Sequence, residues 1–268
     1  MSLPRGRSGR GAMEVATLAA RQAAELLRDR FTGEKRVAHK GRGNIVTQVD
    51  LEVERCLIEL LHQEYPDHSI MTEESQGFQG SSPYTWILDP LDGTRNFASG
   101  IPYFSVTVAL ALREEVLLGI VHDPMREELF WAEKGVGAFL NGSPIRVSAK
   151  ETVQSSVIGF DMGYNDDKAR QALQMVTALW PGMQTMRVMG SAALGITYVA
   201  CGRLDLYFHH TLYPWDLASG LLLVQEAGGL ITESCGAPIR FTSKTAVAAN
   251  PTLHADFMRL TAGLPWRT

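Results

Sequence analysis

The stretch WILDPLDGTRNF, residues 86–97, contains the pattern that decides the fold. A short apolar run leads directly into Asp89, Asp92 follows three residues later, and Gly93 comes next. The apolar run predicts a buried strand, and the glycine predicts a turn after it. Two carboxylates this close together repel each other unless a cation lies between them. The pattern therefore indicates a strand that ends at a charged site.

Length and composition restrict the class of protein. The 268 residues are 45% hydrophobic and 20% charged, with a net charge of −4, which is typical of a globular α/β protein. No basic patch stands out, so we expect no nucleic-acid partner, and no apolar run is long enough for a membrane span. Three widely spaced cysteines in no metal-ligand pattern favour a reducing, cytoplasmic compartment.

Apolar periodicity predicts the order of helices and strands. Helices are expected over residues 13–31 and 50–66, with a polar, glycine-containing mobile loop between them at 33–44. Short apolar segments from 104 to 147 predict an antiparallel meander that is covered on both faces. The remainder alternates strands with helices. We expect residues 1–12 to be a disordered tail or a cloning remnant. Residues 13–268 would then be one catalytic domain of two interlocked halves, about 13–150 and 151–268.

Acidic residues recur where the predicted strands end and the predicted helices begin. In open α/β sheets, ligands collect at the carboxyl ends of strands, so these side chains are expected to converge. A pocket of several acids is stable only if it holds cations, and all-oxygen ligands favour Mg²⁺, or Mn²⁺ as a substitute. The residues concerned are Asp50, Glu73, Glu74, Asp89, Asp92 and Asp216.

The step from Gly93 to Thr94 adds a second element to this predicted site. Glycine allows a backbone N–H to approach a ligand closely, and a helix that starts there supplies further N–H donors for a phosphate. Taken singly, each part has a plain structural role: Glu73 can be a solvated surface acid and Asp216 a charge at a helix N-terminus. Taken together, cations on one side and N–H groups on the other indicate a site for a phosphate monoester.

Four segments resemble signatures of the inositol monophosphatase family. They are NIVTQVD (44–50), TEES (72–75), WILDPLDGTRNF (86–97) and WDLASGLLLVQEAGG (215–229). They occur in the family order, and the resemblance extends from about residue 13 to 263. It implies a layered αβαβα sandwich, usually dimeric, that hydrolyses small phosphate monoesters with Mg²⁺ and is commonly inhibited by lithium.

The resemblance also implies the metal ligands. Glu73, Asp89 and the backbone carbonyl of Leu91 match the ligands of a first metal. Asp89, Asp92 and Asp216 match the ligands of a second.

Further roles are implied in the same way. Glu73 and Thr94 would orient or activate the attacking water, with Asp50 supporting Thr94, and the N–H groups of Gly93 and Thr94 would hold the phosphate. Lys40 matches a mobile-loop residue linked to a third, weaker metal site. The positions that match substrate contacts are Gly190, Ser191, Ala192 and Asp216.

Two positions depart from the family pattern. Arg95 stands where inositol enzymes usually have threonine, and it could pair with a second phosphate or a carboxylate of a substrate, or form a surface ion pair. His209 stands where many have a glutamate that binds inositol hydroxyls; it could contact substrate or be a satisfied structural histidine.

Three functions therefore stay open. The first is hydrolysis of inositol 1-phosphate. The second is hydrolysis of fructose 1,6-bisphosphate, histidinol phosphate or a 3'(2'),5'-bisphosphate nucleotide at the same metal site. The third is a regulatory or binding protein that keeps the fold.

Overall fold

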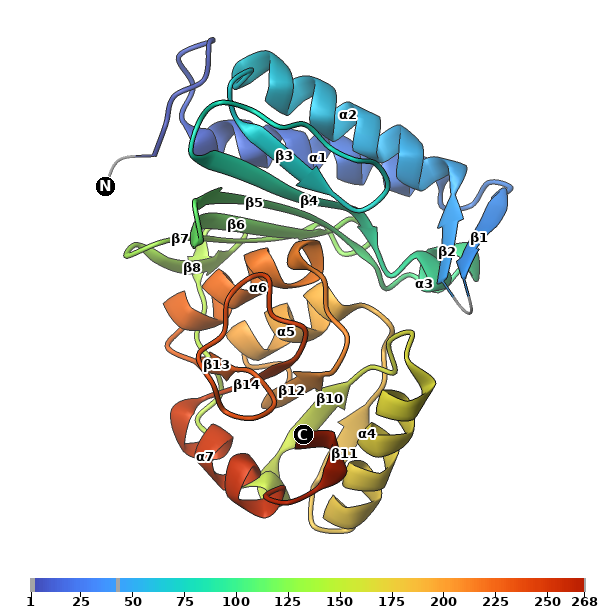
Figure 1. Cartoon of the computed structure of the whole chain (residues 1–268), viewed down its shortest axis with the longest axis vertical. Coiled ribbons are helices and arrows are strands. Elements are labelled where there is room, and N and C mark those ends of the chain that lie inside the picture. The colour runs from blue at the N-terminus through green and yellow to red at the C-terminus, as the bar shows by residue number, and fades with distance from the viewer. Residues whose placement is uncertain (1–2, 42–43, 268) are drawn as a thin grey trace.

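The computed structural model describes residues 3–41 and 44–267, which stack in the order helix, sheet, helix, sheet, helix (Figure 1). This is the αβαβα sandwich that the family resemblance implies. Helices α1 (Ala12–Arg30) and α2 (Gln48–Glu64) form the first layer. Helices α5 (Ala192–Ala200) and α6 (Pro214–Glu226) lie between the two sheets. Helices α4 (Asp166–Leu179) and α7 (Pro251–Leu260) form the outer layer at the other end.

The first sheet has the strand order β3-β4-β5-β6-β7-β8-β9. Apart from the parallel pair of β3 and β4, its neighbours run antiparallel, which confirms the meander. The strands are β3 (Ser69–Thr72), β4 (Tyr84–Asp92), β5 (Ser105–Leu112), β6 (Glu115–Asp123), β7 (Glu128–Glu133), β8 (Gly137–Leu140) and β9 (Ser143–Pro144).

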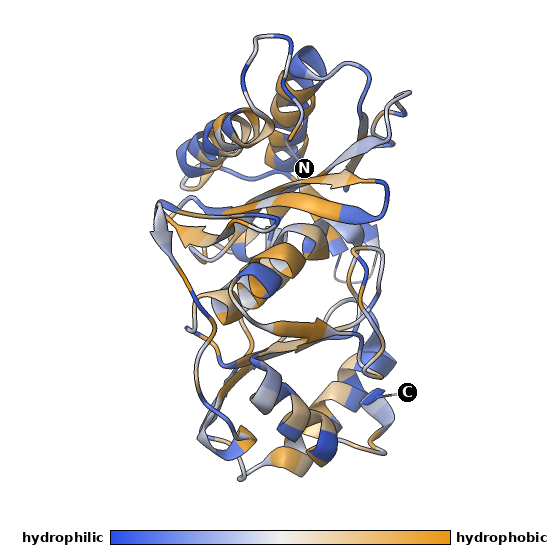
Figure 2. Ribbon diagram, turned by 90° about the vertical axis from the view of Figure 1, so that its left-hand side faces the viewer, coloured by the Kyte–Doolittle hydropathy of each residue, from blue (hydrophilic) through white to orange (hydrophobic). Residues whose placement is uncertain are grey.

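Both faces of this sheet are covered, as its continuously apolar strands predict. Alanines on the buried face of α1 let that helix approach one face closely, and α6 packs on the other. Gly119 on β6 makes the second contact possible, because a Cβ there would lie 2.7 Å from the Cα of Ser219 on α6. Figure 2 shows the resulting apolar strands between the helix layers.

The second sheet has the order β11-β10-β12-β14-β13 and mixes parallel and antiparallel pairs. Its parallel strands β11, β10 and β12 are joined by helices, as an alternating sequence pattern predicts. The strands are β10 (Val157–Phe160), β11 (Thr185–Arg187), β12 (Leu206–His209), β13 (Leu230–Thr232) and β14 (Ala246–Ala249). Two short 3₁₀ turns, Val153–Ser155 and Pro265–Arg267, complete this half.

Two segments differ from the sequence expectation. The predicted loop at 33–44 contains strand β1 (Val37–Gly41), which pairs with β2 (Asn44–Thr47) just after it. Residues 42 and 43 lie outside the described residues. Strand β1 is exposed throughout, so it carries no alternating apolar signal.

The second difference concerns residues 1–12, which the sequence predicts to be a disordered tail or a cloning remnant. Residues 3–11 form a turn in which the N–H of Arg7 donates to the carbonyl of Glu64 at 2.9 Å, at the end of α2. The side chain of Glu64 also accepts the N–H and hydroxyl of Ser8. Residues 1 and 2 lie outside the described residues. The division of the chain into a domain and two halves stays a prediction.

Within the described ranges, no helix combines the length and the hydrophobicity that crossing a bilayer requires.

Candidate functional site

A bulge in β4 brings Asp89 and Asp92 to the same place. The two residues are three apart on β4, but their partners on β5 are only two apart, so one residue is extra. Residues three apart on a regular strand face opposite sides, and the bulge corrects this. Pro90 lies in the bulge, where its missing N–H costs no ladder bond. The N–H of Leu91 donates to the Asp89 carboxylate at 3.0 Å and fixes its direction.

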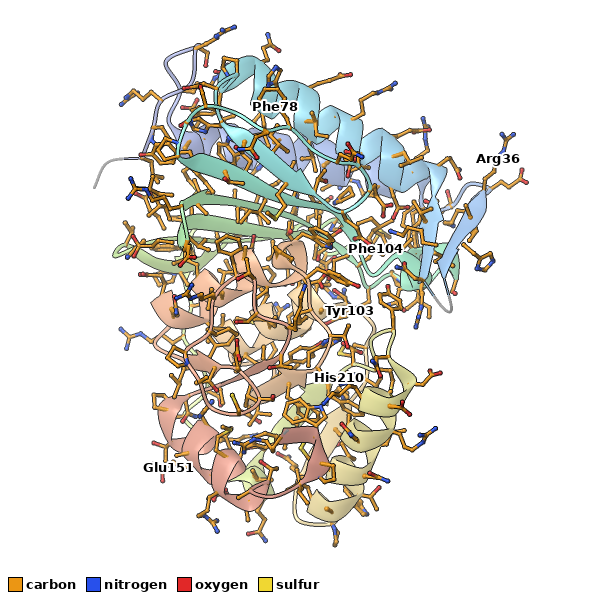
Figure 3. All side chains as sticks on the ribbon, viewed as in Figure 1. Arg36, Phe78, Tyr103, Phe104, Glu151 and His210 are labelled. Atoms are coloured by element: carbon orange, nitrogen blue, oxygen red, sulfur yellow. The ribbon has the colours of Figure 1, made fainter. Side chains whose placement is uncertain are left out.

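Gly93 ends the strand in a conformation that favours glycine. Its φ is +94°, and a Cβ there would lie 3.1 Å from both the Tyr103 carbonyl oxygen and the Phe104 Cβ. Figure 3 shows Tyr103 and Phe104 beside the end of β4. The short helix α3 (Thr94–Ala98) starts directly after this turn. The predicted strand, turn and helix start are thus confirmed.

Three buried or half-buried carboxylates form a cluster that could hold a metal ion. One oxygen each from Asp89, Asp92 and Asp216 lies within 4.8 Å of the others. Asp216 comes from the first turn of α6, where its carboxylate also accepts the N–H of Tyr213 at 2.7 Å. The structure thus brings together residues that lie far apart in the sequence.

The electrostatics of this cluster favour a bound cation. Burial, followed by the charges of Glu73, Asp92 and Asp216, raises the pKa of Asp89 well above its ordinary value. Burial and neighbouring acids raise the pKa of Asp216 in the same way. Burial raises the pKa of Asp92 to about 6. A cation among these oxygens would remove both the desolvation cost and the repulsion, and a donor set of oxygens alone suits Mg²⁺.

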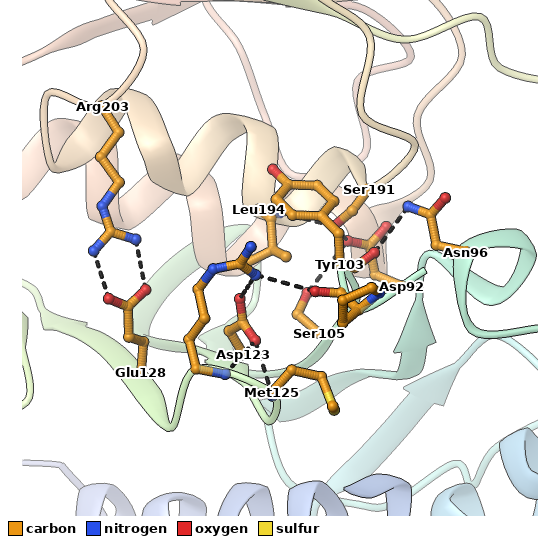
Figure 4. Close-up of polar contacts among 12 residues, drawn as sticks. Asp92, Asn96, Tyr103, Ser105, Asp123, Met125, Glu128, Ser191, Leu194 and Arg203 are labelled. Carbon is orange, nitrogen blue, oxygen red and sulfur yellow. Dashed lines mark hydrogen bonds and ion pairs between the residues drawn. The ribbon is translucent and has the colours of Figure 1, made fainter. Parts of the chain in front are cut away.

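Asp92 is held in place from several directions. Its carboxylate accepts the hydroxyls of Ser105, at 3.2 Å, and Ser191 (Figure 4). It also accepts the N–H groups of Ala192 and Ala193, each at 3.1 Å, at the start of α5. Ser191 is 1% exposed, so its hydroxyl is committed to Asp92 rather than turned toward the pocket described below.

Glu73 lies next to the cluster but is not part of it. Lys40, on β1, reaches across to the carboxylates of Glu73 at 2.9 Å and Glu74 at 2.7 Å. Burial raises the pKa of Glu73, the charge of Lys40 opposes this, and the charges of Asp50 and Asp92 add to it. The basic residue of the predicted loop thus contacts the predicted acids.

Asp50 and Thr94 form a hydrogen-bonded pair beside the cluster. Asp50 accepts the N–H of Thr47 at 2.9 Å and its hydroxyl at 2.5 Å, which caps α2. The Thr94 hydroxyl lies 3.1 Å from Asp50 and 3.0 Å from the carbonyl oxygen of Leu91, and its single hydrogen can serve one of them at a time. Burial raises the pKa of Asp50 to about 6, despite the bonds from Thr47.

A pocket of about 330 Å³ opens beside these residues. It runs from Asp92 and Asp216 to the ends of β10 and β12 and to the turn before α5. The predicted residues on its lining are Asp92, Gly93, Thr94, Arg95, Gly190, Ala192, His209 and Asp216.

The two departures from the family pattern both lie on the lining of this pocket. The guanidinium of Arg95 is exposed and lies 4.7 Å from the ring centroid of Tyr164. His209 is buried, and its Nδ1 accepts the N–H of Thr211 at 3.0 Å. Burial, with the neighbouring His210, lowers the pKa of His209 to about 3. His209 is therefore neutral near pH 7, with its proton on Nε2.

Sequence reasoning missed one acid on this lining. Asp161 follows β10 directly and is 6% exposed. The signal was available, because Asp161 stands at the carboxyl end of a predicted strand, as Asp89 does. No signature segment includes it, so the resemblance gave no reason to select it.

Comparisons with known proteins agree with this geometry. The family model described as "Inositol monophosphatase family" matches residues 11–263. The chain is similar to "Inositol monophosphatase 2" of Solanum lycopersicum, with 37% identity over 92% of this chain and 96% of the relative. It is 41% identical to "Nus factor SuhB" of Haemophilus influenzae, over 82% and 84% of the two chains.

Solved structures give the same result. The extragenic suppressor protein suhB from Bartonella henselae superposes with a TM-score of 0.90 at 33% identity. That match covers 94% of this chain and 98% of the other.

Proposed function

We propose that this chain, which belongs to the inositol monophosphatase family, hydrolyses a small phosphate monoester with the help of Mg²⁺. The observation that carries the proposal is the cluster of Asp89, Asp92 and Asp216, whose oxygens lie within 4.8 Å of one another. Two of these carboxylates are almost fully buried, and burying like charges this close together is unfavourable. A bound cation would compensate for that cost and would give the cluster a role in catalysis.

The proposed ligands are the three aspartates, together with Glu73 and the carbonyl of Leu91. When bound, Mg²⁺ supplies a Lewis acid that offsets charge on the phosphoryl and leaving oxygens. The bond from Leu91 N–H to Asp89 and the bond from Tyr213 N–H to Asp216 hold the two carboxylates in fixed directions. The ligands are thus preorganised by the bulge and by the first turn of α6.

Thr94 and Asp50 are proposed to handle the proton of the attacking water. If Thr94 donates its hydroxyl hydrogen to Asp50, a lone pair of the Thr94 oxygen is left to accept a proton from water. Asp50 has a pKa of about 6, so it can receive a proton near neutral pH. Glu73, a few ångströms from Lys40, would orient the same water. The N–H groups of Gly93 and Thr94, at the start of α3, would hold the phosphate.

The leaving group is proposed to occupy the rest of the pocket. Inositol 1-phosphate is the first candidate, because family members named inositol monophosphatase share 34–37% identity with this chain. Neutral His209 would donate from Nε2 to a hydroxyl oxygen, where a glutamate would accept. Arg95, an exposed residue on the pocket lining, supports the alternative of a bisphosphate such as fructose 1,6-bisphosphate. Histidinol phosphate and a 3'(2'),5'-bisphosphate nucleotide complete the alternatives.

The test is phosphate release by the full chain on these four substrates, with Mg²⁺ and with a chelator. Turnover that needs Mg²⁺ and that is lost in Asp92→Asn supports the proposal, and the preferred substrate names the leaving group. Turnover that persists in the chelator, or in a folded Asp92→Asn variant, refutes the metal assignment.

A second candidate is a regulatory role, which the similarity to a protein named "Nus factor SuhB" favours. The two functions are separable in the source cell. In cells that lack the gene, an Asp89→Asn variant without phosphatase activity that still restores the normal phenotype would show a role that does not need hydrolysis. A phenotype lost together with activity would argue against it.

We also propose that the protein is a homodimer, as the family resemblance implies, and that it is cytoplasmic, as its widely spaced cysteines favour. Light scattering checks the first part: the mass would be twice the 29.5 kDa of one chain. A mass of one chain at micromolar concentration would refute the dimer.

A further inference from the structure

A buried carboxylate outside the acidic cluster organises the turn that precedes α5. One oxygen of Asp161 accepts the N–H groups of Met189, at 2.9 Å, and Gly190, at 2.6 Å. Its other oxygen accepts the hydroxyl of Tyr207 on β12 at 2.8 Å. Two backbone N–H groups and a phenol thus converge on a carboxylate that is 6% exposed. The direction of each carboxylate oxygen is fixed by these donors.

The same turn is held from the opposite side by α3. The amide of Asn96 donates to the carbonyl of Met189 at 2.7 Å and to that of Tyr103 at 2.8 Å. Gly190 has a φ of +81°, and a Cβ there would lie 3.1 Å from the Asn96 amide nitrogen. The turn is therefore clamped between β10 in one half of the molecule and α3 in the other.

The chain continues from this clamped turn directly into the groups that hold Asp92. Ser191 follows Gly190, and its hydroxyl donates to Asp92, as do the N–H groups of Ala192 and Ala193. The covalent step from Gly190 to Ser191 leaves little freedom between the two sets of bonds. A shift of the turn would therefore move the donors that orient Asp92.

We propose that Asp161 is a positioning residue that fixes Asp92 for cation binding through the turn at Met189 and Gly190. This rests on the proposed function in one respect, namely that Asp92 is a ligand. Partners of ligands commonly affect metal affinity by about 10- to 100-fold. Removal of Asp161 takes away the shared acceptor of the Met189 and Gly190 N–H groups, which lie in a half-buried to exposed turn, so the turn is free to move toward water or other partners.

Asp161 has two competing roles that substitution can separate from positioning. After burial, the charge of Asp161 is the next influence that raises the pKa of Asp92, so its charge alone could strengthen cation binding. Asp161 also lines the pocket and could contact the leaving group. Asp161→Asn separates charge from position, because the amide oxygen can still accept from the turn while its NH₂ faces the oxygen of Tyr207.

The experiment measures Mn²⁺ binding to the metal-free full chain by electron paramagnetic resonance, without substrate. The variants are Asp161→Ala, Asp161→Asn and Tyr207→Phe. Asp205→Ala is the matched control: Asp205 is 5% exposed and accepts the N–H of Val157 at 2.7 Å in the same sheet region, away from the cluster. The Asp205→Ala variant should lose about as much stability as Asp161→Ala.

We expect Asp161→Ala to raise the Kd for Mn²⁺ about tenfold or more, with Asp161→Asn and Asp205→Ala within about twofold of the wild type. Tyr207→Phe removes only the hydroxyl that fixes Asp161, and should raise the Kd about two- to fivefold. It keeps the inference testable if Asp161→Ala does not fold, because an unchanged Kd in Tyr207→Phe would then overturn it.

The remaining outcomes are also decisive. An unchanged Kd in folded Asp161→Ala overturns the inference, and a raised KM with that unchanged Kd assigns Asp161 to the substrate instead. Equal loss in Asp161→Asn and Asp161→Ala assigns the effect to charge and overturns it too. If the wild type itself binds no Mn²⁺, the proposed function fails, and the inference fails with it.

Discussion

Asp89→Asn should make the metal-free protein more stable while it removes the response to Mg²⁺. In the described part of the chain, the Asp89 carboxylate accepts one hydrogen bond, from the N–H of Leu91, and an asparagine oxygen can keep it. The substitution therefore removes a charge from a repulsive cluster at little cost in hydrogen bonds. Asp92→Asn is a useful comparison. One oxygen of Asp92 accepts the N–H of Ala192 and the other accepts the N–H of Ala193, and an asparagine has only one oxygen to offer.

The magnitude follows from the raised pKa values. Burial raises the pKa of Asp92 from 3.8 to about 6, which corresponds to about 3 kcal/mol of lost stability above pH 6. Burial and the charges of Glu73, Asp92 and Asp216 raise the pKa of Asp89 in the same direction, so removal of its charge should also stabilise the metal-free protein. The melting temperature should rise by roughly 2–4 °C for each kcal/mol gained. In Asp92→Asn, an unpaired buried N–H costs about 1–3 kcal/mol and offsets most of the gain.

The sign of the pH dependence provides a second check. For a carboxyl with a raised pKa in the folded state, the penalty is absent below its unfolded pKa and grows as the pH rises through the folded pKa. For Asp92 this window runs from 3.8 to about 6. The metal-free wild type should therefore lose stability from about pH 4 upward, and Asp89→Asn should lose less.

The assay is thermal unfolding of both proteins in a chelator and at rising Mg²⁺, at pH 5 and pH 8. A cation at about 100 times its Kd should add about 2.7 kcal/mol to the wild type and much less to Asp89→Asn. A metal-free variant that melts at or below the wild-type temperature at pH 8 would refute the repulsion argument. A variant that gains as much from Mg²⁺ as the wild type would refute the ligand assignment.

Three further predictions concern the residues around the cluster. Thr94→Val should lower kcat by about 10²- to 10⁴-fold with little change in Mn²⁺ affinity, and Thr94→Ser should recover most of it in the phosphate-release assay, because the hydroxyl relays the proton. His209→Glu should raise kcat/KM for inositol 1-phosphate relative to fructose 1,6-bisphosphate, and an unchanged ratio would remove His209 from the specificity pocket. Lys40→Met should lower the free energy of unfolding in urea by about 1.5–3 kcal/mol at pH 8, because Glu73 and Glu74 lose their charged partner. The loss should be smaller at pH 5, where the two glutamates can take up protons. Equal losses at both pH values would contradict this prediction.

Much of the fold was predictable because its signals are local. The buried strand that ends at Asp89, the glycine turn at Gly93 and the acid in the first turn of α6 are each set by neighbouring residues. Helices with one apolar stripe and strands with a continuous apolar run reflect how many faces each element buries. The hairpin of β1 and β2 was missed, because a strand exposed throughout has no face to mark it.

The sequence by itself determined that the chain carries acids at strand ends, a glycine turn that suits a phosphate, and the signatures of its family. Only the tertiary structure decided which of these side chains meet. Asp216 joins Asp89 and Asp92, which lie far from it in the sequence. Ser191, separated from Asp92 by 99 residues, donates to it instead of facing the pocket. The tertiary structure likewise decided that Asp161 is the acceptor for a turn on another element. The physical reason is that a periodic pattern records which face of an element is buried. The partner of each polar group is set by the packing of whole layers.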